Sequence, residues 1–227
     1  TNTDTQNLGT SGDSITLTGK TLTYFGNKDN ADINGNVVLI DKHMTLKTEQ
    51  ILYNLKTNVA SYPTAGTIID NEKTINSQRG AYYSNIHKFI FKDSVTVIAK
   101  DYKIFTDNMH YNSESELSYF FGPSNIVSAN KNIYCENGWY NTKTDIAQFR
   151  ENATITTDDY ILKGDSLFYD KNKGYGIAIN NVEVIDTVEN ITIFGGFAEY
   201  FEKEEFVEIT QTPMLQILFE DDTLFMH

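Results

Sequence analysis

A tyrosine returns at nearly constant intervals along this chain. The intervals between successive members are 29, 30, 28, 29, 29 and 31 residues. The seven members are Tyr24, Tyr53, Tyr83, Tyr111, Tyr140, Tyr169 and Tyr200. A fixed period of this length is typical of stacked repeat architectures, in which each repeat packs on its neighbours. We therefore predict one repeat domain over residues 15–218, preceded by a polar tail (1–14) and followed by the start of a further repeat (219–227) that indicates a truncated chain.

The residues before each tyrosine predict a strand with a bulge. The position seven residues upstream is aliphatic in six of the seven copies: Leu17, Leu46, Ile104, Ile133, Leu162 and Ile193, with Asn76 as the exception. The position two residues upstream and the tyrosine itself have the opposite parity. Because side chains alternate between faces along a strand, one extra residue must lie between the aliphatic position and the two positions nearest the tyrosine. Pairs such as Thr48-Glu49 and Gly164-Asp165 stand there, and small-then-polar residues are typical of a β-bulge.

The residues after each tyrosine predict a turn, a returning strand and a second interruption. Asn54–Thr57, Asn141–Thr144 and Asp170–Lys173 have the polar composition of hairpin turns. All three prolines and several glycines then fall about 10 to 13 residues after a tyrosine: Pro63, Pro123, Pro213, Gly35, Gly66 and Gly122. The two interruptions lie equally far from the turn, so they are opposite each other across the hairpin. The predicted fold is an elongated, V-shaped antiparallel β-jellyroll of seven creased hairpin repeats of about 29 residues.

The interior of this V is apolar, because the opposite parity consists largely of Thr, Asn, Lys, Asp and Glu. Two interpretations stay open: the V closes over a dry core, or it remains open as a lipid-sized groove. In the second case the candidate lipid-contacting residues are the inward-facing apolar side chains of the repeats. They are Leu46, Ile51, Tyr62, Ile104, Met109, Phe120, Ile133, Phe149, Leu162, Leu167 and Ile193.

Charge and composition exclude several functions. The formal net charge of −13 repels phosphate backbones, so we expect no nucleic-acid partner. The four histidines have no metal-ligand spacing, and the single cysteine, Cys135, occupies a position where other repeats carry Gly or Thr. The acidic residues at the bulge, such as Glu49 and Asp107, are interpreted as solvation of the bulge rather than as an acid–base pair. We therefore predict a protein that is not an enzyme, with no catalytic residue, metal or cofactor.

Three phrases carry a resemblance to a known family. Thr48–Asn54, Thr106–Asn112 and Gly164–Asp170 each read as small, acidic, any, aliphatic, any, Tyr and Asn/Asp. In this register the chain resembles the OstA-like family of lipopolysaccharide-transport proteins, which includes a periplasmic bridge component and the N-terminal domain of the outer-membrane translocon.

The resemblance implies a function and a location. It implies a non-enzymatic scaffold that carries or bridges lipopolysaccharide toward the outer membrane and shelters lipid A acyl chains in its apolar interior. It also implies edge-strand pairing with other jellyroll transport proteins, a head-to-tail homo-oligomer, and a periplasmic location with association to the outer membrane. Two alternatives remain: a structural or adhesive β-repeat protein with a dry core and no lipid, and a polysaccharide-active enzyme on a β-solenoid.

Overall fold

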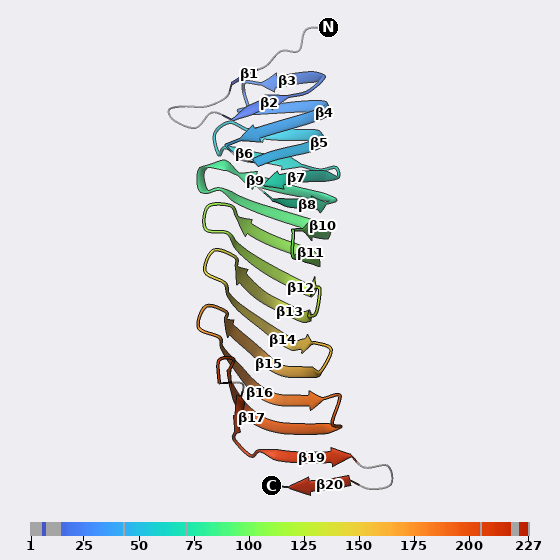
Figure 1. The fold of residues 1–227 in the computed structure, drawn as a ribbon. Coiled ribbons are helices and arrows are strands. Elements are labelled where there is room, and N and C mark those ends of the chain that lie inside the picture. The colour runs from blue at the N-terminus through green and yellow to red at the C-terminus, as the bar shows by residue number, and fades with distance from the viewer. Residues whose placement is uncertain are drawn as a thin grey trace. The chain divides into compact units, whose positions relative to one another are not determined.

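The protein is described here from a computed structural model that covers residues 6–7, 15–42, 44–70, 72–204, 206–218 and 223–226. Over these residues the chain is almost entirely β, and its strands pair in antiparallel fashion (Figure 1). This confirms the predicted all-β antiparallel class, whereas the count of seven repeats stays a prediction. The contacts divide the chain into two units, Thr1–Glu114 and Ser115–His227.

Unit 1 (Thr1–Glu114) is a series of antiparallel strands with one short 3-10 helix. Its long strands β4, β5, β10 and β11 run through both halves of a hairpin, whereas elsewhere two shorter strands cover the same length. The elements are β1 (Gln6–Asn7), β2 (Thr16–Thr18), β3 (Thr21–Phe25), β4 (Asn30–Asp41), β5 (Met44–Asn54), β6 (Val59–Tyr62), β7 (Gly66–Asp70), β8 (Lys73–Ser77), β9 (Arg79–Tyr83), η1 (Ser84–Ile86), β10 (Lys88–Ile98) and β11 (Tyr102–Asn112).

Unit 2 (Ser115–His227) has the same construction. Each of its first five strands pairs along most of its length with the strand that follows it. The elements are β12 (Leu117–Ser128), β13 (Asn132–Asn141), β14 (Ile146–Thr156), β15 (Tyr160–Asp170), β16 (Tyr175–Asp186), β17 (Ile191–Phe201), β18 (Phe206–Thr210), β19 (Met214–Leu218) and β20 (Thr223–Met226).

The strand pairing corrects one member of the tyrosine repeat. Ala60 pairs with Tyr53 on one side and with Tyr82, not Tyr83, on the other. Tyr82 is buried and Tyr83 is only partly buried, so Tyr82 is the inward-facing residue. The assignment of Tyr83 was wrong because two tyrosines are adjacent in sequence. With Tyr82, each interval from Tyr24 to Tyr169 becomes 29 residues.

The correction also removes the exception seven residues upstream. Counting from Tyr82, that position is Ile75, which is buried, instead of Asn76. Ile75 pairs with Ile68 and with Val97, both of which are buried as well. The aliphatic position therefore holds in every copy from Leu17 to Ile193.

The predicted crease is present, but its extra residue lies on the returning strand. In β10, Asp93 and Ser94 stand opposite the single residue Asp107 of β11. Asp93 and Ser94 both have a positive φ, at 63° and 54°. The same two-against-one register shift recurs where β4 pairs with β5, β12 with β13, β14 with β15 and β16 with β17. The prediction placed the extra residue on the tyrosine-bearing strand. In the sequence of that strand the apolar residues change face, and this change looks the same as the insertion of a residue.

Two acidic residues at the crease bind side chains of the bulge. Glu136 accepts a hydrogen bond from the side chain of Asn152, and Asp165 accepts two from Asn181. Asn152 and Asn181 have positive φ values of 58° and 49° and belong to the two-residue bulges. Asn is among the residues that best tolerate this conformation, and the carboxylate holds its side chain in place.

Each crease separates two parts of a hairpin, which we call the hairpin arm and the distal arm. The hairpin arm contains the repeated tyrosine and ends at the predicted polar turns, where Asn54 and Asn141 accept backbone hydrogen bonds from Thr57 and Thr144 at 2.8 and 3.0 Å. The distal arm lies beyond the crease and contains the aliphatic position. Pro63 falls between β6 and β7, at the break between the two arms, as predicted.

The predicted domain boundaries at 1–14, 15–218 and 219–227 remain predictions. Residues 1–5, 8–14, 219–222 and 227 lie outside the described residues, so most of the tail and half of the final segment are not covered. Among the residues that are described, no helix is long and apolar enough to span a membrane.

Candidate functional site

The inward-facing aliphatic residues of the distal arm form a continuous row across the strands, which we call the apolar ladder. In unit 1 each member is paired with the next in the backbone register. The members are Leu17, Leu39, Leu46, Ile68, Ile75, Val97 and Ile104. None of these side chains is more than 3 % exposed, so unit 1 has a closed, dry core along its whole ladder.

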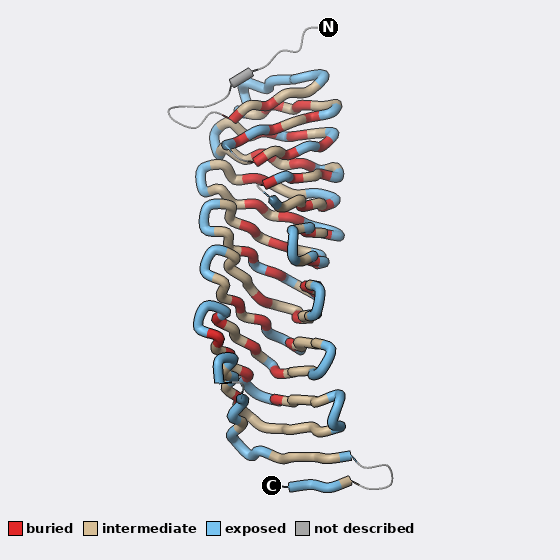
Figure 2. Tube along the Cα trace, viewed as in Figure 1, coloured by how far each residue is buried: buried red, intermediate tan, exposed pale blue. Residues whose placement is uncertain are grey.

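Unit 2 carries the same ladder, but most of it is partly exposed. The register again pairs each member with the next. The members are Ile126, Ile133, Ile155, Leu162, Val184, Ile193 and Leu215. Ile126 is buried, and every member from Ile133 onward is partly exposed. In Figure 2 the buried residues are frequent in β4–β11, whereas β17 and β19 are mostly of intermediate burial.

The partly exposed ladder spans β13–β19. Its six members occupy six successive strand positions, so the row is about 24 Å long at ~4.8 Å per strand. It offers only aliphatic side chains. A row of this kind suits contact with apolar chains, which it would remove from water, and it offers no polar or ionisable group.

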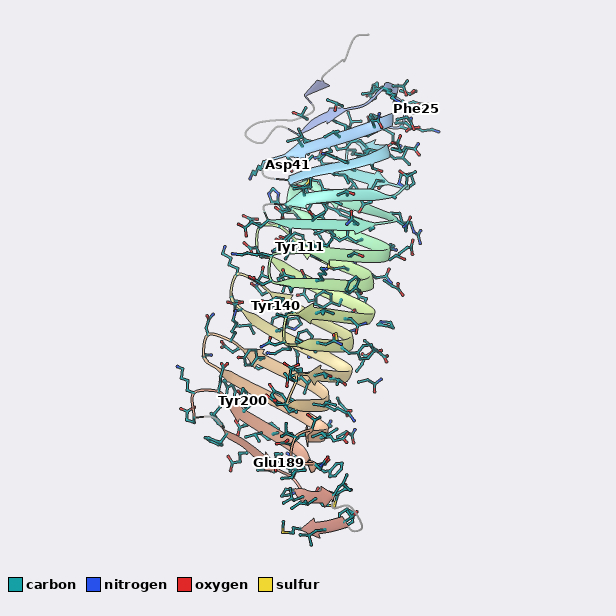
Figure 3. All side chains as sticks on the ribbon, turned by 45° about the vertical axis from the view of Figure 1, so that its right-hand side comes forward. Phe25, Asp41, Tyr111, Tyr140, Glu189 and Tyr200 are labelled. Atoms are coloured by element: carbon teal, nitrogen blue, oxygen red, sulfur yellow. The ribbon has the colours of Figure 1, made fainter. Side chains whose placement is uncertain are left out.

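Arms of unit 1 are joined by hydrogen bonds between tyrosines and buried carboxylates. Tyr111 donates to Oδ2 of Asp70 at 2.8 Å, and Tyr82 donates to Oδ2 of Asp41, which lies at the end of β4. Tyr111 and Asp41 are labelled in Figure 3. Tyr82 belongs to the hairpin arm, in the same row as Ala31 of β4. Asp41 is ten residues beyond Ala31, or about 33 Å along a straight strand. The contact therefore requires β4 to fold back at its crease and bring the two arms face to face.

Unit 2 has a different arrangement at the matching place. Fifty-eight residues after Asp70, or two 29-residue repeats, stands Ser128, whose hydroxyl donates to the backbone carbonyl of Lys131. The hydroxyl of Tyr169, two repeats after Tyr111, donates to Glu202 at 2.9 Å instead. Burial, together with the neighbouring Glu202 carboxylate, raises the pKa of Tyr169. The ammonium group of Lys131 lies 5.7 Å from the centre of the Tyr169 ring.

The structure sorts the candidate residues from the sequence into two groups. The first group is buried: Leu46, Ile51, Tyr62, Ile104 and Met109 in unit 1, and Phe120, Phe149 and Leu167 in unit 2. The second group is partly exposed and consists of Ile133, Leu162 and Ile193. These three lie on alternate strands of one ladder. Their roles as lipid contacts stay a proposal.

Sequence reasoning did not include the ladder members on the returning strands, Ile155, Val184 and Leu215, among its candidates. They are paired directly with Leu162, Ile193 and their neighbours. The signal was present in the sequence, because each lies 15 residues after a repeated tyrosine. Within the described residues, no cluster of three or more His, Cys, Asp or Glu side chains has the arrangement of a metal site.

The antiparallel fold and the apolar ladder together define a β-repeat scaffold with an apolar interior. A family model described as OstA-like protein matches residues 8–107 and 103–165, which is more than half of the chain. The chain therefore belongs to the OstA-like family of lipopolysaccharide-transport proteins, which are transport scaffolds and not enzymes.

Among solved structures, the fold is similar to that of LptH from Pseudomonas aeruginosa. LptH is described as the LptA-homologous periplasmic component of the lipopolysaccharide transport device. The match has a TM-score of 0.45 and 11% sequence identity, and it covers 47% of this chain and 81% of LptH. No curated protein sequence matches the chain.

Proposed function

We propose that this protein carries or bridges lipopolysaccharide toward the outer membrane, and that lipid A acyl chains contact the partly exposed apolar ladder of unit 2. The observation that carries the proposal is the continuous row from Ile133 to Leu215, which is aliphatic throughout and incompletely covered. A soluble protein rarely exposes a long apolar row without a ligand or partner for it.

Acyl burial supplies the affinity in this proposal. Each methylene that leaves water contributes about 0.8 kcal/mol, so a chain of ten methylenes offers ~8 kcal/mol before the costs of binding. The net charge of −13 offers no general attraction for an anionic headgroup. The acyl chains, rather than the phosphorylated sugars, are therefore the part of the lipid that this chain recognises.

Edge strands are the proposed sites for partners. Among the described strands, β3 pairs only with β4, and β20 pairs only with β19. An unpaired strand edge is a template for strand addition. We propose that other jellyroll transport proteins, or a second copy in head-to-tail order, pair at such edges in the periplasm. The assembly formed in this way would be a bridge that reaches the outer membrane.

The rival function is a structural or adhesive scaffold that takes no lipid. The closed core of unit 1 is the observation that favours it, because a dry interior is all that such a protein needs. The two functions differ in whether the apolar ladder of unit 2 binds lipid.

Lipid uptake separates these two functions. Lipids that co-purify with the protein are extracted and identified by mass spectrometry. The protein is then titrated with a fluorescent lipid A analogue. We expect saturable binding that Ile193→Asp reduces at least tenfold, because a carboxylate would enter the apolar row. The matched control is Thr192→Asp, which introduces the same charge at the adjacent residue of β17, on the opposite face. Absence of binding by the wild-type protein would favour the lipid-free scaffold.

A further inference from the structure

We infer that the two units are functionally unequal: unit 2 alone takes acyl chains, and unit 1 is a closed module that takes none. The inference rests on the proposed function and goes beyond it, because the same ladder runs through both units. What differs between them is how far the ladder is covered, together with the side chains of some hairpin arms.

In unit 1 aromatic side chains fill part of the hairpin arm. Tyr62, Tyr82, Phe89 and Phe91 are all buried to 2 % exposure or less. Tyr82 stacks on Phe89 with ring centres 4.3 Å apart, and Phe89 lies 5.5 Å from Phe91. The Tyr62 hydroxyl is hydrogen-bonded to the hydroxyl of Ser77 at 2.8 Å. Rings of this size leave the ladder of unit 1 no access to water or to a ligand.

In unit 2 the position of Phe91 keeps a buried ring in β12 and β14, as Phe120 and Phe149, whereas β16 carries small residues at both positions. Gly176 and Ala178 lie 87 residues, or three 29-residue repeats, after Phe89 and Phe91. Ala147 lies two repeats after Phe89. On the adjacent strand, Ala198 pairs with Ala178 and is buried with it. Gly176, Ala178 and Ala198 are all buried, so β16 and β17 line their interior with side chains much smaller than the rings of β9 and β10.

The hydrogen bonds between the arms follow the same division. Asp41 and Asp70 accept from Tyr82 and Tyr111 in unit 1, which fixes the arms together over the aromatic core. Ser128 replaces the carboxylate at the position two repeats after Asp70, and Tyr169 turns to Glu202. Unit 1 therefore has an aromatic interior and two hydrogen bonds between its arms, whereas the ladder of unit 2 is partly exposed from Ile133 onward and Ser128 has no carboxylate for Tyr169.

Photo-crosslinking on the full chain tests this inference. A photoreactive amino acid is placed at Leu46 in one variant and at Leu162 in another, four repeats apart in the same ladder position. Each variant is irradiated with the fluorescent lipid A analogue. We expect the yield of labelled protein from position 162 to exceed that from position 46 at least tenfold. Equal yields would overturn the inference and leave the proposed function standing, whereas labelling at position 46 alone would overturn both.

A second experiment fills unit 2 with the side chains of unit 1. Gly176→Phe with Ala178→Phe reproduces Phe89 and Phe91. A Cβ on Gly176 would meet its nearest neighbours at 3.4 to 3.6 Å, which is ordinary contact, so the substitution starts without a backbone clash. We expect at least a tenfold loss of lipid affinity with an unchanged β-sheet circular dichroism spectrum.

The matched control for filling is Ile177→Phe, which adds a ring to the outward-facing residue between the two filled positions. This control is expected to bind lipid like the wild type. Wild-type affinity in the folded double variant would overturn the inference, and failure of every form, including the wild type, to bind lipid would instead refute the proposed function. If the double variant does not fold, the crosslinking yields decide.

Discussion

The hydroxyl of Tyr111 donates a 2.8 Å hydrogen bond to the carboxylate of Asp70, 41 residues earlier in the chain. Tyr82 and Asp41 form the same contact at the same separation, one 29-residue repeat earlier. Each bond joins a hairpin arm to a distal arm, so the pair holds unit 1 closed across its opening. The ammonium group of Lys73 lies 5.3 Å from the centre of the Tyr111 ring and adds a favourable cation–π contact.

Removal of the Tyr111 hydroxyl tests the importance of this bond. Tyr111→Phe keeps the ring and leaves the buried Asp70 with one hydrogen bond fewer, so the free energy of unfolding should fall by about 1–3 kcal/mol in urea denaturation. Tyr24→Phe is the control, because Tyr24 holds the same place in the repeat but is 56% exposed. Equal, negligible effects of both substitutions would show that the arms are held by packing alone.

Stability should decline at alkaline pH. Burial raises the pKa of the Cys135 thiol to about 12 from its usual value of 9.0, and burial also raises the pKa of Tyr62. Between pH 9 and 12 the unfolded thiol loses its proton while the folded thiol keeps it, so the unfolded state binds fewer protons and stability falls as pH rises. The measurement is the free energy of unfolding at pH 8 and at pH 10.5.

Cys135→Ala separates the contribution of the thiol from that of the tyrosines. This variant should lose less stability between the two pH values than the wild type does, because it has no thiol to deprotonate. An identical pH dependence in the variant would assign the alkaline decline to tyrosines such as Tyr62.

The crease of β12 offers a test of backbone strain. Gly122 has φ +89°, and a Cβ built on it would have no neighbour within 4 Å. Gly122→Ala therefore adds conformational strain without a steric clash, and we expect a loss of about 1 kcal/mol in the free energy of unfolding. Gly138→Ala provides the contrast, because its Cβ would lie 2.7 Å from the backbone oxygen of Gln148 and should cost more. A larger loss at Gly122 than at Gly138 would contradict this account of the crease.

Periodicity was enough to predict the hairpins, their turns and the position of the crease. It was not enough to choose between Tyr82 and Tyr83, since both residues are tyrosines and only the pairing with Ala60 distinguishes them. Periodicity also could not predict which strand carries the extra residue of the bulge. A bulge changes the relative register of two strands, and one strand read alone does not show which of them is longer.

The state of the interior depends on residues outside the aliphatic position. Leu46 and Leu162 are the same residue at the same place in the repeat, yet one is buried and the other partly exposed. The difference does not follow from one position of the opposing arm. Gly176 and Ala178 replace Phe89 and Phe91 in β16, but Ala60 stands at the Phe89 position in unit 1 and Phe149 at the Phe91 position in unit 2. Which ladder members are covered depends on which arms face one another, and that comes from the fold.

Leu46 and Leu162 also provide the most direct measure of how open unit 2 is. Leu46→Ala removes a fully buried side chain and should cost about 2–5 kcal/mol, because it leaves a cavity among well-packed neighbours. Leu162→Ala removes a side chain that already contacts water, so we expect a loss below about 1.5 kcal/mol. Hydrogen exchange of the amides flanking each site reports the stability of its own unit. Addition of the lipid A analogue should then raise protection around Leu162 and leave that around Leu46 unchanged. Equal costs for the two substitutions would mean that the ladder of unit 2 is as well covered as that of unit 1, and the distinction between a closed and an open unit would be wrong.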